Sequence, residues 1–135
     1  MRPHRGLRLA ALAALLAAAG GARAEWTEVA ADNGIYAAYA DRGTIRRDGP
    51  YATMRGLYDF PRGDFTPEGM RMHSTTVERQ YDCREPRVRL VSYADHAERL
   101  GRGTVVASGG ARQRWEAAVD GSLDLAYWKI ACEGA

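Results

Sequence analysis

The first 24 residues limit what the rest of the chain can become more than any other feature, because they have the pattern of a secretory signal peptide. A basic start leads into the 11-residue apolar stretch 9–19, and the small residues Ala22 and Ala24 stand at positions −3 and −1 of a cut. A membrane-spanning helix needs about 20 apolar residues. We therefore expect cleavage after Ala24, which leaves residues 25–135 to fold as one domain outside the cytoplasm.

The expected location depends on this segment and on two features of the remaining chain. No second long apolar stretch occurs, so we expect no transmembrane segment. No cysteine precedes Cys83, so the lipidated cysteine of bacterial lipoproteins is missing and we expect no lipid anchor. The predicted location is the periplasm or the cell surface.

Export also determines how the two cysteines, Cys83 and Cys132, are interpreted. In an oxidising compartment an even pair forms a disulfide by default. A zinc site is the weaker interpretation, because neither cysteine has another cysteine or a histidine within four residues. A catalytic thiol is the third interpretation. A disulfide would close a loop of about 50 residues and contribute about 4 kcal/mol in the chain-entropy model, which matters for so small a domain.

Runs rich in β-branched and aromatic residues predict an antiparallel sheet. The predicted strands are 26–29, 35–41, 51–60, 74–83, 87–94 and 104–108. Asn33 and Gly34 predict a hairpin between the first two, since both residues tolerate positive φ. A turn is predicted at 47–50. The stretch Pro61 to Gly69, with two prolines and two glycines, is predicted to be a loop.

In the last segment of the chain the spacing of apolar residues changes to that of a helix. One helical face collects Leu123, Ala126, Tyr127, Ile130 and Ala131. Ser122 is the expected N-cap, and Asp124 in the first turn suits the helix dipole. The predicted fold class is α+β: a single small domain in which an antiparallel sheet carries a C-terminal helix on one face, with one disulfide.

No residue pattern indicates catalysis, a cofactor or a metal. His73 and His96 are 23 residues apart and lack metal-binding spacing. Gly101 and Gly103 lack the lysine of a phosphate-binding loop, because the only lysine is Lys129, so turns are the better interpretation. Residues 25–135 hold 15 basic and 17 acidic side chains, a balance that disfavours nucleic-acid binding. We expect a protein that is not an enzyme.

Four arginines around the hairpin near Cys83 are the candidate partner-binding residues: Arg79, Arg84, Arg87 and Arg89. They predict either a cationic patch for an acidic partner or a solvated face of mixed charge. We favour the mixed-charge face, because Asp82 would share the outer face with Arg87 and Arg89 and pair with them across the strands. Trp128 is a fifth candidate, since it falls between the apolar positions of the helix and either widens the buried stripe or contacts a partner.

The chain resembles the surface-adhesin protein E family of exported bacterial proteins. The resemblance is carried by Trp26, Ile35, Tyr36, Tyr39, Asp41, Ile45, Tyr58, Asp59, Tyr81, Asp82, Cys83, Leu90, Gly101, Gly103, Val105, Val106, Trp115, Gly121, Ser122, Trp128 and Cys132. The triplet at 81–83 with the late tryptophan and cysteine is its most specific part, and the resemblance covers nearly all of residues 25–135.

This resemblance implies an antiparallel sheet with a packed helix, a disulfide between the two cysteines, and no enzymatic activity. It also implies binding to host extracellular-matrix and plasma proteins such as laminin and vitronectin. The chain differs from the family's namesake in lacking a lysine-rich stretch before the cysteine-bearing strand, where only Arg71, His73 and Arg79 are basic. The alternative function is a periplasmic accessory or stress-response protein that binds an envelope protein or a small ligand.

Overall fold

The computed structural model describes residues 23–110 and 113–134 and consists of one antiparallel sheet with a C-terminal helix. The predicted signal peptide lies outside the described residues except for Arg23 and Ala24. The strands are β1 (Trp26–Ala30), β2 (Ala37–Asp48), β3 (Tyr51–Phe65), β4 (Arg71–Asp82), β5 (Arg87–His96), β6 (Val105–Gly109) and β7 (Glu116–Ala117), and the helix is α1 (Leu123–Glu133).

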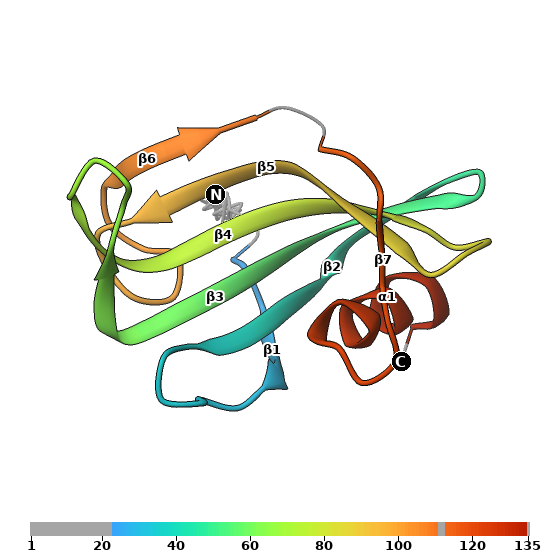
Figure 1. Ribbon diagram of the computed structural model, residues 1–135, viewed down its shortest axis with the longest axis horizontal. Coiled ribbons are helices and arrows are strands. Elements are labelled where there is room, and N and C mark those ends of the chain that lie inside the picture. Colours follow the sequence, from blue (N-terminus) through green and yellow to red (C-terminus); the bar gives the residue numbers. More distant parts are fainter. Residues whose placement is uncertain (1–22, 111–112, 135) are drawn as a thin grey trace, which may run out of the picture.

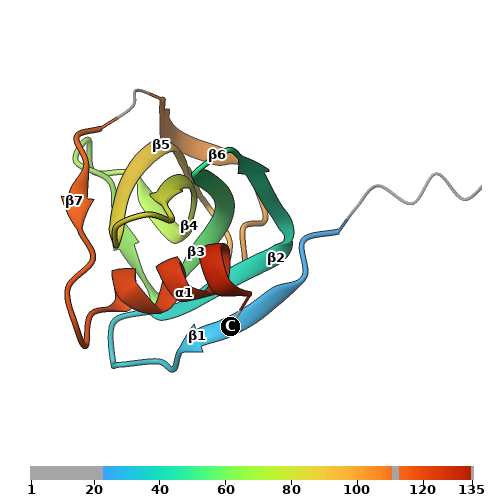
Figure 2. The ribbon, with the colours of Figure 1, turned by 90° about the vertical axis from the view of Figure 1, so that its right-hand side faces the viewer.

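Sequential strands are neighbours in the sheet, which runs in the order β1-β2-β3-β4-β5-β6 (Figure 1). Every pair is antiparallel, and the short β7 pairs with the start of β5. Figure 2 shows α1 lying across the strands, with the sheet curving behind it. The predicted α+β class is therefore confirmed. None of the described helical residues forms a segment long and apolar enough to cross a bilayer.

The predicted opening hairpin is confirmed, because β1 and β2 pair, but its connection differs from the expected one. Only Gly34 has positive φ there, at 97°. Asn33 acts through its side chain instead, since its Oδ1 accepts hydrogen bonds from the backbone N–H groups of Ile35 and Tyr36. Ile35 and Tyr36 therefore belong to the connection between the two strands, and β2 begins at Ala37.

The predicted loop at 61–69 is wrong over its first half, because β3 continues to Phe65. Asp64 pairs with Met72 and Phe65 with Arg71, after an irregularity between Asp59 and Asp64. The irregular stretch accommodates Pro61, which has no N–H to donate to a regular ladder. Pairing with β4 thus overrides the local signal for a break. The predicted turn at 47–50 is likewise shorter, since β2 runs through Asp48.

The face of the sheet beneath α1 holds the main core. Its buried members are Ala38, Ala40, Ala52, Met54, Tyr81 and Val88 from the sheet and Tyr127, Ile130 and Ala131 from the helix. The small sheet residues let the helix approach closely. Gly56 is one such close point, because a Cβ there would lie 3.3 Å from the Tyr127 ring.

The helix begins at the N-cap that the sequence predicts. Ser122 is the N-cap, and its hydroxyl accepts a hydrogen bond from the Leu125 N–H at 3.1 Å. Gly134 ends the helix with φ 69°, a left-handed conformation that glycine adopts without strain. The disulfide predicted between Cys83 and Cys132 is present, with Cα atoms 5.4 Å apart. It joins the end of α1 to the β4–β5 hairpin.

Candidate functional site

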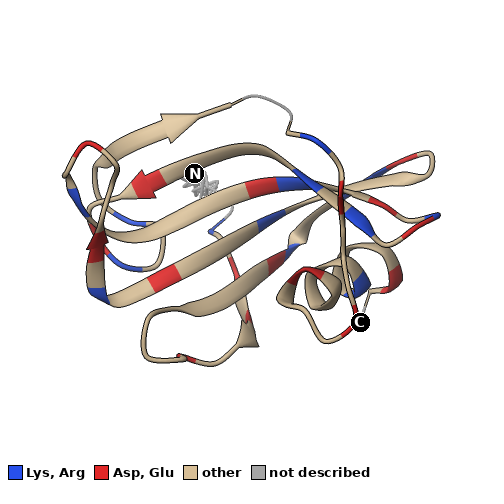
Figure 3. Ribbon diagram, viewed as in Figure 1, with Lys and Arg blue, Asp and Glu red and all other residues tan. Residues whose placement is uncertain are grey.

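Three of the predicted arginines, Arg84, Arg87 and Arg89, gather around the β4–β5 hairpin, where basic and acidic residues are interleaved (Figure 3). Arg79 belongs to β4 but packs toward the helix. Its guanidinium lies 5.4 Å from the Tyr58 ring centroid and pairs with Asp124 of α1 at 3.2 Å. The four arginines therefore do not form one continuous surface.

Arg79 nevertheless comes near Arg89 at the edge of the sheet. Both residues line a hollow of about 200 Å³ between β5, β7 and the start of α1. The Arg79 side chain is only 18% exposed. Its ion pair with Asp124 and its packing on aromatic rings indicate that Arg79 mainly stabilises the contact between the sheet and α1.

Asp82 is the centre of the hairpin cluster, because its carboxylate is fully buried between two arginines. Arg84 donates to it from Nε and Nη2 and from its backbone N–H, and Arg87 donates from Nη2 at 2.5 Å. These bonds, those from Arg84 foremost, hold the pKa of Asp82 well below its ordinary range. The ion pair predicted between Asp82 and Arg87 is therefore present.

The prediction that these charged side chains form a solvated face is wrong for Asp82. Asp82 has no exposed surface, whereas Arg84 and Arg87 keep 58% and 35% of their side-chain surfaces exposed. Arg89 does not pair with Asp82 as predicted. It donates twice to Oε1 of Gln80, its cross-strand neighbour, at 2.8 and 2.6 Å.

Two aromatic side chains complete this surface, and sequence reasoning did not assign them to it. Trp115, just before β7, stacks on Tyr51 with ring centroids 5.6 Å apart and planes 20° from parallel. Arg89 and Arg87 lie 4.3 and 5.1 Å from the centroid of Trp115, and Arg84 lies 5.3 Å from that of Tyr51. We call Tyr51, Arg84, Arg87, Arg89 and Trp115 the arginine–aromatic stack. Trp115 reaches this surface only through the pairing of β7 with β5, so no local sequence pattern places it here.

The stack holds its arginines in fixed positions while Arg84 stays exposed and Arg87 and Arg89 stay partly exposed. A planar guanidinium on an aromatic ring keeps its edge N–H groups available for carboxylates. Asp82 fixes Arg84 and Arg87 from below, and Gln80 fixes Arg89. The surface is thus preorganised for acidic groups. Two acids, Asp82 and Glu85, pair with its arginines, and Glu116 lines a hollow together with Arg89.

Trp128, the remaining candidate, is half-buried against the helix-side core. Its indole N–H donates to the backbone carbonyl of Asp82 at 2.8 Å. The side chain therefore supports the hairpin that carries the stack.

His73 and His96 lie away from the stack, and each has a polar contact through one ring nitrogen. His73 Nδ1 is 2.8 Å from the carbonyl oxygen of Ala97, and His96 Nε2 is 2.8 Å from the Thr76 hydroxyl. Burial lowers the pKa of His96 below its ordinary range. Within 23–110 and 113–134, no group of three or more acidic, histidine or cysteine side chains is placed to hold a metal ion.

Comparisons with known proteins agree with this architecture. The model of a family described as surface-adhesin protein E matches residues 26–133. Comparison with curated proteins found no match. Among solved structures, protein E from non-typeable Haemophilus influenzae superimposes with a TM-score of 0.64 at 14% identity, covering 84% of this chain and 79% of that one.

Two further structures of Haemophilus influenzae protein E show the same likeness. One has a TM-score of 0.64 at 16% identity and covers 84% of this chain and 88% of the other. A second crystal form has a TM-score of 0.61 at 16% identity and covers 72% and 80%. At these identities the structures establish the shared fold, while the family model matches most of the sequence. The chain belongs to the surface-adhesin protein E family.

Proposed function

We propose that this protein is exported, cleaved after Ala24, and acts at the cell surface as a non-enzymatic binding protein for extracellular-matrix or other acidic protein partners. The observation that carries the proposal is the arginine–aromatic stack. It presents three arginines in fixed positions around one hairpin, half-exposed and next to two flat rings. Arginine and aromatic side chains are the residues that dominate binding energy in protein interfaces.

The rigidity of the stack supports a binding role over a merely solubilising one. Exposed arginines on long, free side chains lose conformational entropy when they bind, whereas stacked ones have already lost it. Asp82, Gln80 and the rings hold these side chains in advance. Membership of an adhesin family supports the same interpretation.

The proposal is tested by exchanging guanidinium groups for ammonium groups without changing the charge. A double variant Arg87→Lys and Arg89→Lys keeps a cation beside Asp82 but loses planar stacking on Trp115. We expect its binding to immobilised laminin and vitronectin, measured by surface plasmon resonance, to weaken at least about tenfold. Arg87→Glu is unsuitable, because it would place a second carboxylate against buried Asp82.

A matched control uses two exposed arginines on β2, Arg42→Lys and Arg46→Lys. This variant should bind as the wild type does. Equal binding by the stack variant and the wild type would remove the stack from the function. Equal weakening of both variants would show that the loss is not specific to the stack and would contradict the proposal as well.

A further inference from the structure

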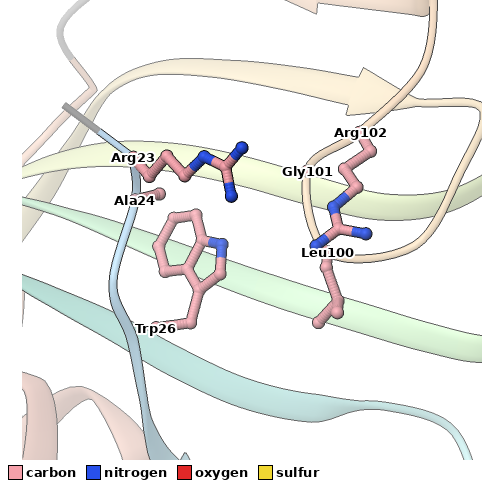
Figure 4. Close-up of a pocket in the computed structure, with 6 residues that line it drawn as sticks. All are labelled: Arg23, Ala24, Trp26, Leu100, Gly101 and Arg102. Carbon is pink, nitrogen blue, oxygen red and sulfur yellow. The ribbon is translucent and has the colours of Figure 1, made fainter. Parts of the chain in front are cut away.

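A second candidate site lies away from the arginine–aromatic stack, between the start of β1 and the connection from β5 to β6. It is a hollow of about 530 Å³ lined by Arg23, Ala24, Trp26, Leu100, Gly101 and Arg102 (Figure 4). Arg23 and Ala24 precede the expected cleavage position, so this volume is that of the uncleaved chain, and the mature chain keeps the other four residues as walls. None of these four belongs to the stack.

The walls offer hydrogen-bond donors and no carboxylate. Figure 4 shows the indole nitrogen of Trp26 turned toward the gap and the guanidinium of Arg102 extending from the opposite wall. The Trp26 indole N–H donates to no atom of residues 23–110 or 113–134, unlike that of Trp128. The Arg55 guanidinium lies 5.7 Å from the Trp26 ring centroid, and the cross-strand neighbours of Arg55 are the acids Asp41 and Glu78. A ligand that supplies hydrogen-bond acceptors suits this hollow, and a carboxylate suits the Arg102 guanidinium in particular.

The wall opposite Trp26 is held in a strained shape. Leu100 has φ 59°, the one positive φ outside glycine in the described residues. The fully buried carboxylate of Asp59 accepts the Leu100 N–H at 2.9 Å, and the buried hydroxyl of Ser74 accepts the Gly101 N–H at 2.9 Å. Backbone strain that buried groups hold in place is typical of functional sites, because it fixes a binding geometry in advance.

The wall is closely packed at Gly101. Gly101 has φ 71°, and a Cβ on it would lie 3.1 Å from Thr76 and 3.8 Å from the Trp26 ring. Arg99 also donates to Asp59, from Nε and Nη2 at 3.0 and 2.7 Å. The connection therefore holds the backbone at Leu100 and Gly101 at a set position relative to Trp26.

We propose that this hollow binds a sugar acid, a pyranose ring that carries a carboxylate. The ring packs its C–H face against the indole of Trp26 and the side chain of Leu100. The carboxylate accepts hydrogen bonds from the Arg102 guanidinium, whose planar fork matches its geometry, and from the Trp26 N–H. This small-molecule site goes beyond protein binding through the stack. The same chemistry, a ring with a free carboxylate, occurs in N-acetylmuramic acid that has been released from its stem peptide and in N-acetylneuraminic acid of host glycans.

The test follows the three indole N–H resonances of the mature, exported protein by ¹⁵N NMR during titration with each sugar acid. Trp26→Phe assigns the Trp26 resonance. We expect that resonance to shift in a saturable way, with those of Trp115 and Trp128 unchanged. Saturation by N-acetylmuramic acid alone supports a bacterial ligand, by N-acetylneuraminic acid alone a host ligand, and by both the shared chemistry.

Matched probes and variants decide the outcome. N-Acetylglucosamine has the ring of N-acetylmuramic acid without its carboxylate, and lactate has the carboxylate without the ring, so both should bind at least about tenfold more weakly. Arg102→Gln should weaken binding about tenfold, whereas Arg46→Gln on β2 should not change it. Equal binding of N-acetylglucosamine, a shift of the Trp115 resonance instead, or no shift at millimolar sugar acid would overturn the proposal.

Discussion

Asp82 is the residue on which the candidate binding surface depends, because a buried carboxylate stands beneath two arginines that face solvent. We expect Asp82→Asn to lower the free energy of unfolding by about 2 kcal/mol at neutral pH, since charged hydrogen bonds from Arg84 and Arg87 are lost. Exposed Asp48→Asn on β2 is the control and should change it by less than about 0.5 kcal/mol. Urea unfolding measures both values.

The stability difference between the wild type and Asp82→Asn should depend on pH. Folding lowers the pKa of Asp82 from its ordinary 3.8, chiefly through hydrogen bonds from Arg84. Its contribution is therefore complete above the unfolded-state pKa and is lost as the pH falls below it. The stabilities of the wild type and Asp82→Asn should converge toward about pH 2. A difference that stays constant down to that pH would show that the ionised carboxylate is not what stabilises the hairpin.

At the scale of elements, the disulfide and the N-cap hold opposite ends of α1. Removing the disulfide with Cys83→Ala and Cys132→Ala should lower the free energy of unfolding by about 4 kcal/mol, because the unfolded chain regains the freedom of a loop of 49 residues. Ser122→Ala, which removes the N-cap hydrogen bond and leaves the tether intact, should cost about 1 kcal/mol. Equal losses in the two variants, measured by urea unfolding, would contradict a stabilising role for the closed loop.

Elements with a strong local pattern were predictable from the sequence, and those that depend on distant pairing were not. The face of α1 and its N-cap Ser122 follow from spacing alone. The extension of β3 to Phe65 does not, because proline and glycine signal a break that pairing with β4 overrides. In the candidate site, the pairing of Asp82 with Arg87 follows from alternation along the strands, whereas the position of Trp115 depends on β7 reaching β5.

At the scale of the whole molecule, the proposed function requires that the hairpin stack meet partners outside the cell. We expect protease added to intact cells of the native organism to cut the mature chain, since a surface protein is accessible where a periplasmic one is not. A periplasmic marker protein that stays intact is the control for an unbroken outer membrane. Full protection of the chain, with release by osmotic shock, would contradict surface adhesion and favour a periplasmic accessory role. The proposed sugar-acid hollow would remain testable in that case, because the cell wall that contains N-acetylmuramic acid lies in the periplasm.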